Sequence, residues 1–463
     1  MVANNPPIAN TIRQWWQACA VYTEKKMITV LLLGFSSGLP LALTFGTLSL
    51  WLVEEGISKT SIGLFALTGV PYTFKFLWSP LIDQLPIPLL TARLGRRRSW
   101  ALLTQVALMI SLFGLGLSKP GETPFVTALL ALCTAFWSAS QDIVLDAYRV
   151  EILEERQYGA GAAMSVLGYR LGMLASGAMA LYLATFFGWL VTYTLMAALM
   201  GVGIATILLN PEPVSRPASP AHTQVGPLPA LLAGWAGRDG RLGRLVAWIG
   251  RAIIAPFADF MGRDSWGIVL LFILFYKLGD TLAGVMSNPF YLELAFSKID
   301  IANISKVFGL GATLAGSVVG GVIVNRLGIM QSLLYCGILQ MLSNLMFVLL
   351  AYTGHNLAVL TGTIAVENFS SGMGTAAFVA YLSSLCNIAY TATQYALLSS
   401  FMAFGRTVLA SFGGSMADHM SWSAFFLLTT LAAVPGLVLL WLMMQRFTPA
   451  LQPATEQLDE PLT

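Results

Sequence analysis

The sequence predicts an all-α membrane protein with about twelve transmembrane helices. Of its 463 residues, 56% are hydrophobic and 10% are charged, and the mean hydropathy is +0.73. A soluble domain of this composition would expose large apolar patches. Apolar runs of about 20 residues, long enough to cross a hydrocarbon core of about 30 Å, recur along nearly the whole chain. A long polar break divides these runs into two sets, which indicates two bundles of six helices.

The apolar runs place the spans in chain order. We expect them at residues 27–53, 61–83, 99–118, 124–148, 159–187, 189–208, 266–294, 302–324, 330–351, 356–387, 394–417 and 421–445. The first run follows Lys25 and Lys26 and is not followed by a cleavage site of small residues, so it is interpreted as a retained helix and not as a signal peptide.

The segments between and around the spans complete the expected organisation. They are an N-terminal cytoplasmic segment at 1–26, bundles at 27–208 and 266–445, a cytoplasmic linker at 209–265 and a cytoplasmic tail at 446–463. Within the linker, residues 242–257 fit either an amphipathic helix on the inner leaflet or a plain connection.

The basic residues predict the orientation of the chain in the membrane. Most of the 25 Lys and Arg residues fall on the side of the N-terminus. Those placed on the opposite side are Lys59, Lys119, Lys298 and Lys306. Because positively charged loops stay in the cytoplasm, both termini are expected there. The net charge of +3 is therefore a topology signal and not a nucleic-acid-binding patch.

The two halves repeat each other at an offset of about 236 to 240 residues, as in transporters built from parallel repeats. Gly168 and Arg170 in the first half match Gly405 and Arg406 in the second. Glycine and proline also interrupt corresponding spans. These interruptions are Gly34, Gly38 and Pro40 in the first half and Gly279, Gly284 and Pro289 in the second. They favour cavity-lining helices, although close packing through small residues is the alternative.

Charged residues lie deep inside several spans, where each costs about 2.5–3.5 kcal/mol. At about 1.5 Å per residue, Arg170, Lys277 and Arg406 lie about 16–18 Å from the span ends. Lys277 and Asp280 are three residues apart and can form a pair. That pair either handles a proton or a substrate anion, or merely allows insertion. Glu367 is either a titrating carboxyl group or a neutral acid bonded to a neighbouring helix.

Further charges lie closer to the cytoplasmic ends. Lys75 either faces the cavity or extends to the interface. Asp142, Asp146 and Arg149 share one helix face at the end of the fourth span, where they form an inner gate or a solvated helix end. Asp142 lies deepest of the three, so the functional interpretation is stronger for it.

Other classes of function find little support. The three histidines, His222, His355 and His419, lack metal-ligand spacing, and the four cysteines form no C-x-x-C motif. Gly159-Ala160-Gly161 has no preceding strand and is not a nucleotide-binding loop. We therefore expect no enzyme activity and no cofactor other than a proton as coupling ion.

One predicted cytoplasmic loop combines an acidic residue with a run of arginines. Asp83 is followed by Gly95 and by Arg96, Arg97 and Arg98, with a degraded second copy that ends in Asn325-Arg326. This pattern resembles the signature of the major facilitator superfamily. The resemblance implies that this loop latches helices together at a cytoplasmic gate. A plain positive-inside anchor would account for the arginines alone.

A larger set of segments extends this likeness over about residues 29 to 440. These segments are 34–44, 74–81, 95–98, 138–144, 159–173, 276–280, 367–368 and 372–375. With them, the chain resembles the AmpG-type muropeptide permeases of that superfamily. The resemblance implies proton-coupled import of anhydro-muropeptides across the bacterial inner membrane for peptidoglycan recycling, with a link to β-lactamase induction. It also implies a sugar-peptide substrate and a monomer in the lipid bilayer. A permease for another anionic conjugate, such as an acyl-coenzyme A, is the alternative.

Such a substrate suggests roles for the residues above. The expected substrate-binding residues are Lys75, Gln105, Gln141, Tyr169, Arg170, Lys277, Asn344, Asn368 and Arg406. The expected proton-coupling residues are Asp142, Asp280 and Glu367. The expected cytoplasmic gate consists of Asp83, Arg96, Arg97, Arg98, Asp146 and Arg149.

Overall fold

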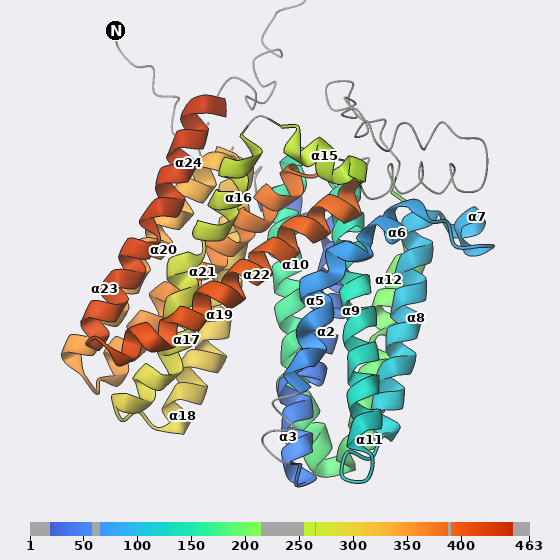
Figure 1. Ribbon diagram of the computed structural model, residues 1–463, viewed down its shortest axis with the longest axis horizontal. Helices are drawn as coiled ribbons and strands as arrows, with labels where there is room; N and C mark the ends of the chain where they lie inside the picture. The colour runs from blue at the N-terminus through green and yellow to red at the C-terminus, as the bar shows by residue number, and fades with distance from the viewer. Residues whose placement is uncertain (1–18, 58–64, 214–253, 264, 388–389, 448–463) are drawn as a thin grey trace, which may run out of the picture.

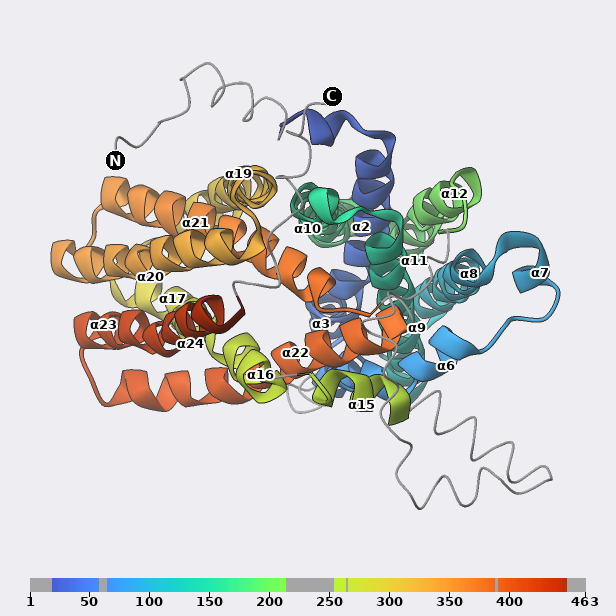
Figure 2. The ribbon, with the colours of Figure 1, turned by 90° about the horizontal axis from the view of Figure 1, so that it is seen from above.

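The computed structural model describes residues 19–57, 65–213, 254–263, 265–387 and 390–447. Every regular element in these residues is helical, and the helices form two bundles that stand side by side (Figures 1 and 2). The first bundle contains α2 to α12, and the second contains α16 to α24. The predicted all-α fold of two bundles is therefore confirmed.

The first bundle follows the chain from residue 21 to residue 209. Its helices are α2 (Lys25–Thr44), α3 (Gly46–Glu54), α5 (Val70–Phe74), α6 (Ser79–Gln84), α7 (Leu90–Leu94), α8 (Arg96–Leu117), α9 (Pro124–Ile152), α10 (Tyr158–Leu174), α11 (Ala180–Leu199) and α12 (Gly201–Leu209). Short 3₁₀ turns occupy Val21–Thr23, Ala66–Gly69, Lys75–Leu77 and Glu155–Gln157, and a π turn occupies Ala175–Met179.

The second bundle is preceded by α15 (Ala255–Met261), at the end of the predicted linker. Its helices are α16 (Trp266–Phe275), α17 (Leu278–Glu293), α18 (Lys298–Asp300), α19 (Gly309–Leu327), α20 (Ile329–Thr353), α21 (Leu357–Ser384), α22 (Thr391–Asp418), α23 (Trp422–Ala432) and α24 (Val434–Phe447). A π turn at Ile301–Phe308 leads into α19.

Most predicted spans correspond to one helix or to two helices in line. By length and composition, eight helical stretches among the described residues can cross a membrane. One of them, Glu155–Leu209, contains two predicted spans, and its backbone turns at Gly188 (φ 77°), between them. Of the segment 242–257, residues 242–253 lie outside the described part of the chain and the rest enters α15.

Glycine allows helices α2 and α10 to touch backbone to backbone. A Cβ atom built on Gly38 would lie 2.0 Å from the carbonyl oxygen of Tyr169, and one on Gly168 would lie 2.0 Å from that of Leu31. Only residues without a side chain permit this approach, which is the usual helix contact in lipid. Gly38 therefore serves close packing, whereas Gly284 of α17 has no atom within 4 Å of a built Cβ.

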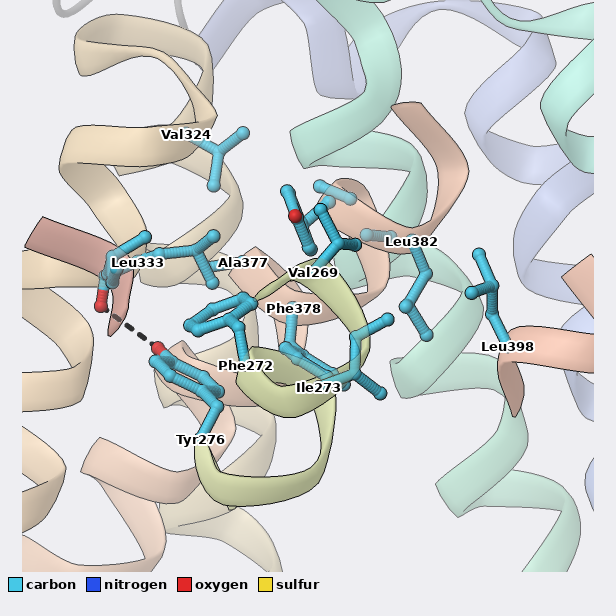
Figure 3. Close-up of a cluster of buried hydrophobic side chains, with 14 of the residues drawn as sticks. Val269, Phe272, Ile273, Tyr276, Val324, Leu333, Ala377, Phe378, Leu382 and Leu398 are labelled. Carbon is cyan, nitrogen blue, oxygen red and sulfur yellow. Dashed lines mark hydrogen bonds between the residues drawn. The ribbon is translucent and has the colours of Figure 1, made fainter. Parts of the chain in front are cut away.

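An aromatic cluster holds α16 against α20 and α21 in the second bundle (Figure 3). Tyr276 stacks on Phe378 with ring centroids 5.2 Å apart, and its hydroxyl donates to the Leu333 carbonyl at 3.0 Å. Because Tyr276 directly precedes Lys277, this anchor fixes where the break between α16 and α17 places the lysine.

The described contacts between the bundles gather at one end, which we call the linker end: the end with α15, α6 and the first turns of α10 and α22. There α10 packs on α19, and α22 packs on α9 and α6. The Tyr22 hydroxyl also donates to the Val318 carbonyl of α19 at 2.9 Å. Towards the opposite end, with α3 and α18, the bundles diverge in Figure 1.

Candidate functional site

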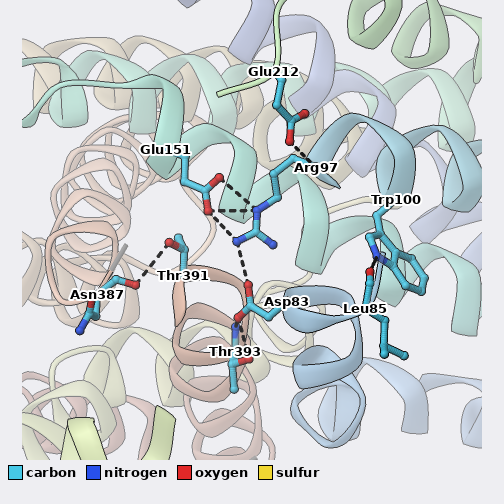
Figure 4. Close-up of polar contacts among 9 residues, drawn as sticks. All are labelled: Asp83, Leu85, Arg97, Trp100, Glu151, Glu212, Asn387, Thr391 and Thr393. Atoms are coloured by element: carbon cyan, nitrogen blue, oxygen red, sulfur yellow. Dashed lines mark hydrogen bonds and ion pairs between the residues drawn. The ribbon is translucent and has the colours of Figure 1, made fainter. Parts of the chain in front are cut away.

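Asp83, Arg97 and Glu151 form a buried ion network at the linker end (Figure 4). Arg97 Nη2 lies 2.7 Å from Asp83 Oδ1 and 2.6 Å from Glu151 Oε1. Asp83 and Arg97 are each 1% exposed. Two carboxylates around one guanidinium provide the charge pairing that buried ions require.

The same aspartate also joins the two bundles. Its Oδ2 accepts hydrogen bonds from both the backbone N–H and the hydroxyl of Thr393, each at 2.7 Å. Thr393 lies in the first turn of α22, where helix N–H groups lack partners within the helix and favour an anion. Asp83 therefore holds the end of the second bundle through α22 and holds the first bundle through Arg97.

The remaining arginines of the loop stabilise the start of α8. Glu212, in the segment that leaves α12, accepts from the backbone N–H groups of Arg97 at 2.7 Å and Arg98 at 2.9 Å, and so caps the helix. The Arg98 side chain donates to the carbonyls of Ile207 and Leu208. Arg96 is half-buried and interacts electrostatically with Arg97 and with the surrounding acids.

Arg149 forms a second contact between the bundles. It pairs with Asp146 at 3.2 Å and donates to the Ser165 hydroxyl at 2.9 Å, both within the first bundle. Its guanidinium carbon lies over the Tyr395 ring of α22, 5.2 Å from the centroid. A cation over an aromatic face is attractive, and more so when both are buried, as Arg149 and Tyr395 are.

A polar cluster surrounds Lys277 inside the second bundle. The Lys277 ammonium lies 3.5 Å from Asp280 Oδ2, which is the pair expected from their spacing. It also donates to Gln340 Oε1 and Thr375 Oγ1, each at 3.2 Å. Asp280 accepts in addition from the Ser371 hydroxyl at 3.3 Å. Helices α17, α20 and α21 therefore all contribute to one charged site.

Glu367 is half-buried on α21, and its carboxyl group is influenced by the charges of Asp280 and Lys277 of its own bundle and of Arg170 of α10. Helix α21 packs on α10, so the two bundles are in contact at these helices. Arg170 and Arg406 occupy corresponding positions in the two sequence halves. Arg170 is half-buried, whereas the side chain of Arg406 lies outside the described residues.

Asp142 is the central acid of the first bundle. It accepts a hydrogen bond of 2.5 Å from Ser37 of α2 and interacts electrostatically with Lys75. Lys75 is buried at 7% exposure. Lys277 and Asp280 form an ion pair in the second bundle, whereas Lys75 influences the charge of Asp142 without a direct ion pair among the described residues.

Several of the predicted substrate-binding residues contact neighbouring helices of their own bundle in this structure. Gln141 donates to the Ser36 carbonyl at 3.0 Å, and Asn368 accepts from the Thr313 hydroxyl at 2.9 Å. Gln105 and Asn344 are 0% and 1% exposed. A direct contact with substrate would require these two side chains to be uncovered. Tyr169 is half-buried, and its carbonyl faces Gly38.

The sequence interpretation missed several partners of these residues. They are Glu151, Glu212, Gln340, Ser371, Thr375 and Thr393. Two of them carried a usable signal. Glu151 is an acid at the end of a span that faces the arginine loop, and Glu212 lies between prolines directly after a helix.

Comparison with known proteins defines the class. A family model described as Major Facilitator Superfamily matches residues 30–395. The fold agrees with two solved structures, which show the fold alone at their low identity. The proton:xylose symporter XylE matches with a TM-score of 0.57 and 12% identity over 94% of this chain and 96% of that chain. The human organic anion transporter MFSD10 matches with a TM-score of 0.56 and 16% identity over 94% and 100%. The chain therefore belongs to the major facilitator superfamily, and its two bundles have the fold of that superfamily.

Closer relatives define the branch. The anhydromuropeptide permease of Escherichia coli (strain K12) is 42% identical over 426 residues, which cover 92% of this chain and 81% of the relative. The putative transporter AmpG 4 of Rickettsia felis is 34% identical over 91% of this chain and 97% of its own length. The chain belongs to the AmpG family of the major facilitator superfamily.

Proposed function

We propose that this protein imports anhydromuropeptides across the inner membrane by proton-coupled alternating access. The relative at 42% identity is named for that substrate, and the identity extends over 92% of the chain. The observation that carries the mechanism is a set of four charged residues contributed by both bundles, which we call the charged path. It consists of Arg170 in the first bundle and Glu367, Asp280 and Lys277 in the second.

This path suits an anionic substrate with many hydroxyl and amide groups. Arg170 and Lys277 supply cations from different bundles, so one bound carboxylate attracts both. Gln340, Ser371 and Thr375 surround Lys277 with groups that donate and accept hydrogen bonds. A substrate held in this way contacts both bundles and favours the conformations in which they lie close together.

The pairing of Lys277 with Asp280 supports the proposed proton coupling. While Asp280 is ionised, it attracts the ammonium at 3.5 Å. Protonation removes that attraction and leaves Lys277 available for the substrate carboxylate. We infer a second proton site at Asp142 in the first bundle, where Lys75 exerts an electrostatic influence on the carboxyl group. Glu367, beside two cations and one acid, is a further proton carrier in the path.

We assign the described structure to a state that is closed at the linker end. Asp83 bonds Thr393 across the bundles, and Arg149 lies over Tyr395. We assign the linker end to the cytoplasm, on the basis of the positively charged loops there. The substrate then enters from the opposite end, and release into the cytoplasm requires both contacts to separate.

Uptake into proteoliposomes tests the proposal. Labelled anhydromuropeptide should accumulate when the outside is acidified, whereas an acyl-coenzyme A should neither accumulate nor compete. Accumulation without dependence on the gradient would remove proton coupling, and no accumulation at all would remove the substrate assignment.

A matched pair of variants tests the charged path. Arg170→Ala should weaken binding about 10- to 100-fold, the loss expected for one charge-assisted contact. Arg156→Ala removes an exposed arginine whose ion pairs are with Glu24 and Glu154. This variant should transport as the parent protein does. Equal uptake by both variants in correctly inserted protein would exclude Arg170 from the site.

A further inference from the structure

The last segment of the linker is bonded to the start of α22. Asp259 of α15 is 9% exposed and accepts hydrogen bonds with both carboxylate oxygens. Oδ1 accepts from Asn387 Nδ2 at 3.0 Å, and Oδ2 accepts from Gln394 Nε2 at 2.7 Å. Arg263 completes the shell, 2.9 Å from Oδ2.

Gln394 is fully engaged in this arrangement. Its Oε1 accepts from the Asn387 backbone N–H at 2.7 Å and from Arg263 at 3.2 Å. Its Nε2 donates to the Pro256 carbonyl at 3.1 Å as well as to Asp259. At 1% exposure, Gln394 has no water to replace a lost partner, so its position depends on α15.

Gln394 directly follows Thr393, the residue that Asp83 binds from the first bundle. Consecutive residues in the first turn of α22 are thus held from different sides, one by the first bundle and the other by α15. Thr393 donates its backbone N–H and its hydroxyl to a single carboxylate oxygen, which demands a defined position of this turn.

We propose that Asp259 is a positioning residue of the gate at the linker end: through Gln394 it holds the first turn of α22 where Thr393 meets Asp83. This inference rests on the proposed alternating access but not on the substrate. Helix α15 fixes the position of this turn before the bundles meet. The first turn of α22 therefore loses less conformational freedom when the gate closes. Loss of Asp259 therefore favours the state that is open at the linker end.

Spin-label distances measure that equilibrium without any substrate. One label pair at the exposed positions Glu155 and Gln331 spans the linker end, and another at Phe125 and Tyr352 spans the opposite end. Cys19 and Cys133, the exposed native cysteines, are replaced by serine in every variant.

Asp259→Asn keeps the size of the side chain and removes its charge. We expect the ratio of open to closed molecules at the linker end to rise about tenfold, as for the loss of one hydrogen bond to a charged group. The Glu155–Gln331 distance should lengthen while the Phe125–Tyr352 distance shortens. General destabilisation would broaden both distributions without this reciprocal change. Asp259→Glu, which restores the charge, should recover part of the closed population.

Asp300→Asn is the matched control, because Asp300 is also hydrogen-bonded, by Ser297, but lies at the opposite end. If Asp259→Asn changes the distances no more than this control does, the proposal is wrong. The proposal also requires that Asp259→Asn change the label distances little further when Asp83→Asn is already present. If the effects of the two substitutions on the distances are fully additive, the proposal is wrong. Should Asp259→Asn fail to insert, Asn387→Ala, which removes one donor, is expected to change the distances in the same direction.

Discussion

Replacing Thr393 with valine isolates a single hydrogen bond between the bundles. Valine keeps the shape and the backbone N–H but removes the hydroxyl, which donates to Asp83 Oδ2 at 2.7 Å. Asp83 and Thr393 are each 1% exposed, so water does not replace the lost donor. A hydrogen bond to a charged group contributes about 1.5–3 kcal/mol. The closed population should therefore fall about 10- to 100-fold relative to the open population.

The distance between spin labels at Glu155 and Gln331 reports this change in the ratio of closed to open molecules. Measuring the unfolding temperature of the variant shows whether the fold is destabilised as well. Thr185→Val is the control, because the Thr185 hydroxyl is exposed and bonds only the Leu181 carbonyl of its own helix. Thr393→Val with the same distance distribution as Thr185→Val would refute the role of this bond in closure.

Three further variants test packing, capping and charge pairing. Gly38→Ala places a methyl group 2.0 Å from a carbonyl oxygen and should destabilise the fold by about 1–3 kcal/mol in thermal unfolding, whereas Gly311→Ala, with no atom within 4 Å, should not. Glu212→Ala removes the cap of α8 and should lower stability by about 1 kcal/mol, and an unchanged melting temperature would contradict the cap. Lys277→Met leaves Asp280 without its cation and should abolish uptake at a cost of about 1–3 kcal/mol in stability. Adding Asp280→Asn should restore stability but not uptake, so recovered uptake would exclude the pair from transport.

The features that the sequence could predict are local or periodic. Apolar runs located the spans, and an i, i+3 spacing located the pair of Lys277 and Asp280, because neighbours on one helix are fixed by helix geometry. The hydrogen bond between Asp83 and Thr393 joins residues 310 positions apart. The sequence around either residue does not indicate that the other is its partner. Such a contact depends on how the helices are arranged, which only the structure provides.

The type of a residue predicts its contacts less well than the direction in which its side chain leaves the helix. Amide side chains suit a sugar, which is why the sequence predicts substrate contacts at Gln105, Gln141, Asn344 and Asn368. An amide can equally well hydrogen-bond a neighbouring helix, as Gln141 does with the Ser36 carbonyl. Without the direction of each side chain, these alternatives cannot be separated by sequence. The interrupting glycines pose the same problem, since Gly38 packs against a backbone and Gly284 faces open space.

The predicted linker is fastened at both of its described ends. Glu212 caps α8 in the first bundle, and the Tyr148 hydroxyl donates to the Pro211 carbonyl at 2.8 Å, while Asp259 bonds the start of α22. Contacts within the described residues therefore position both of these ends. Co-expressed halves, cut within residues 214–253, should find each other and assemble, which offers a route to labelling one bundle in isotopes or fluorophores without labelling its partner.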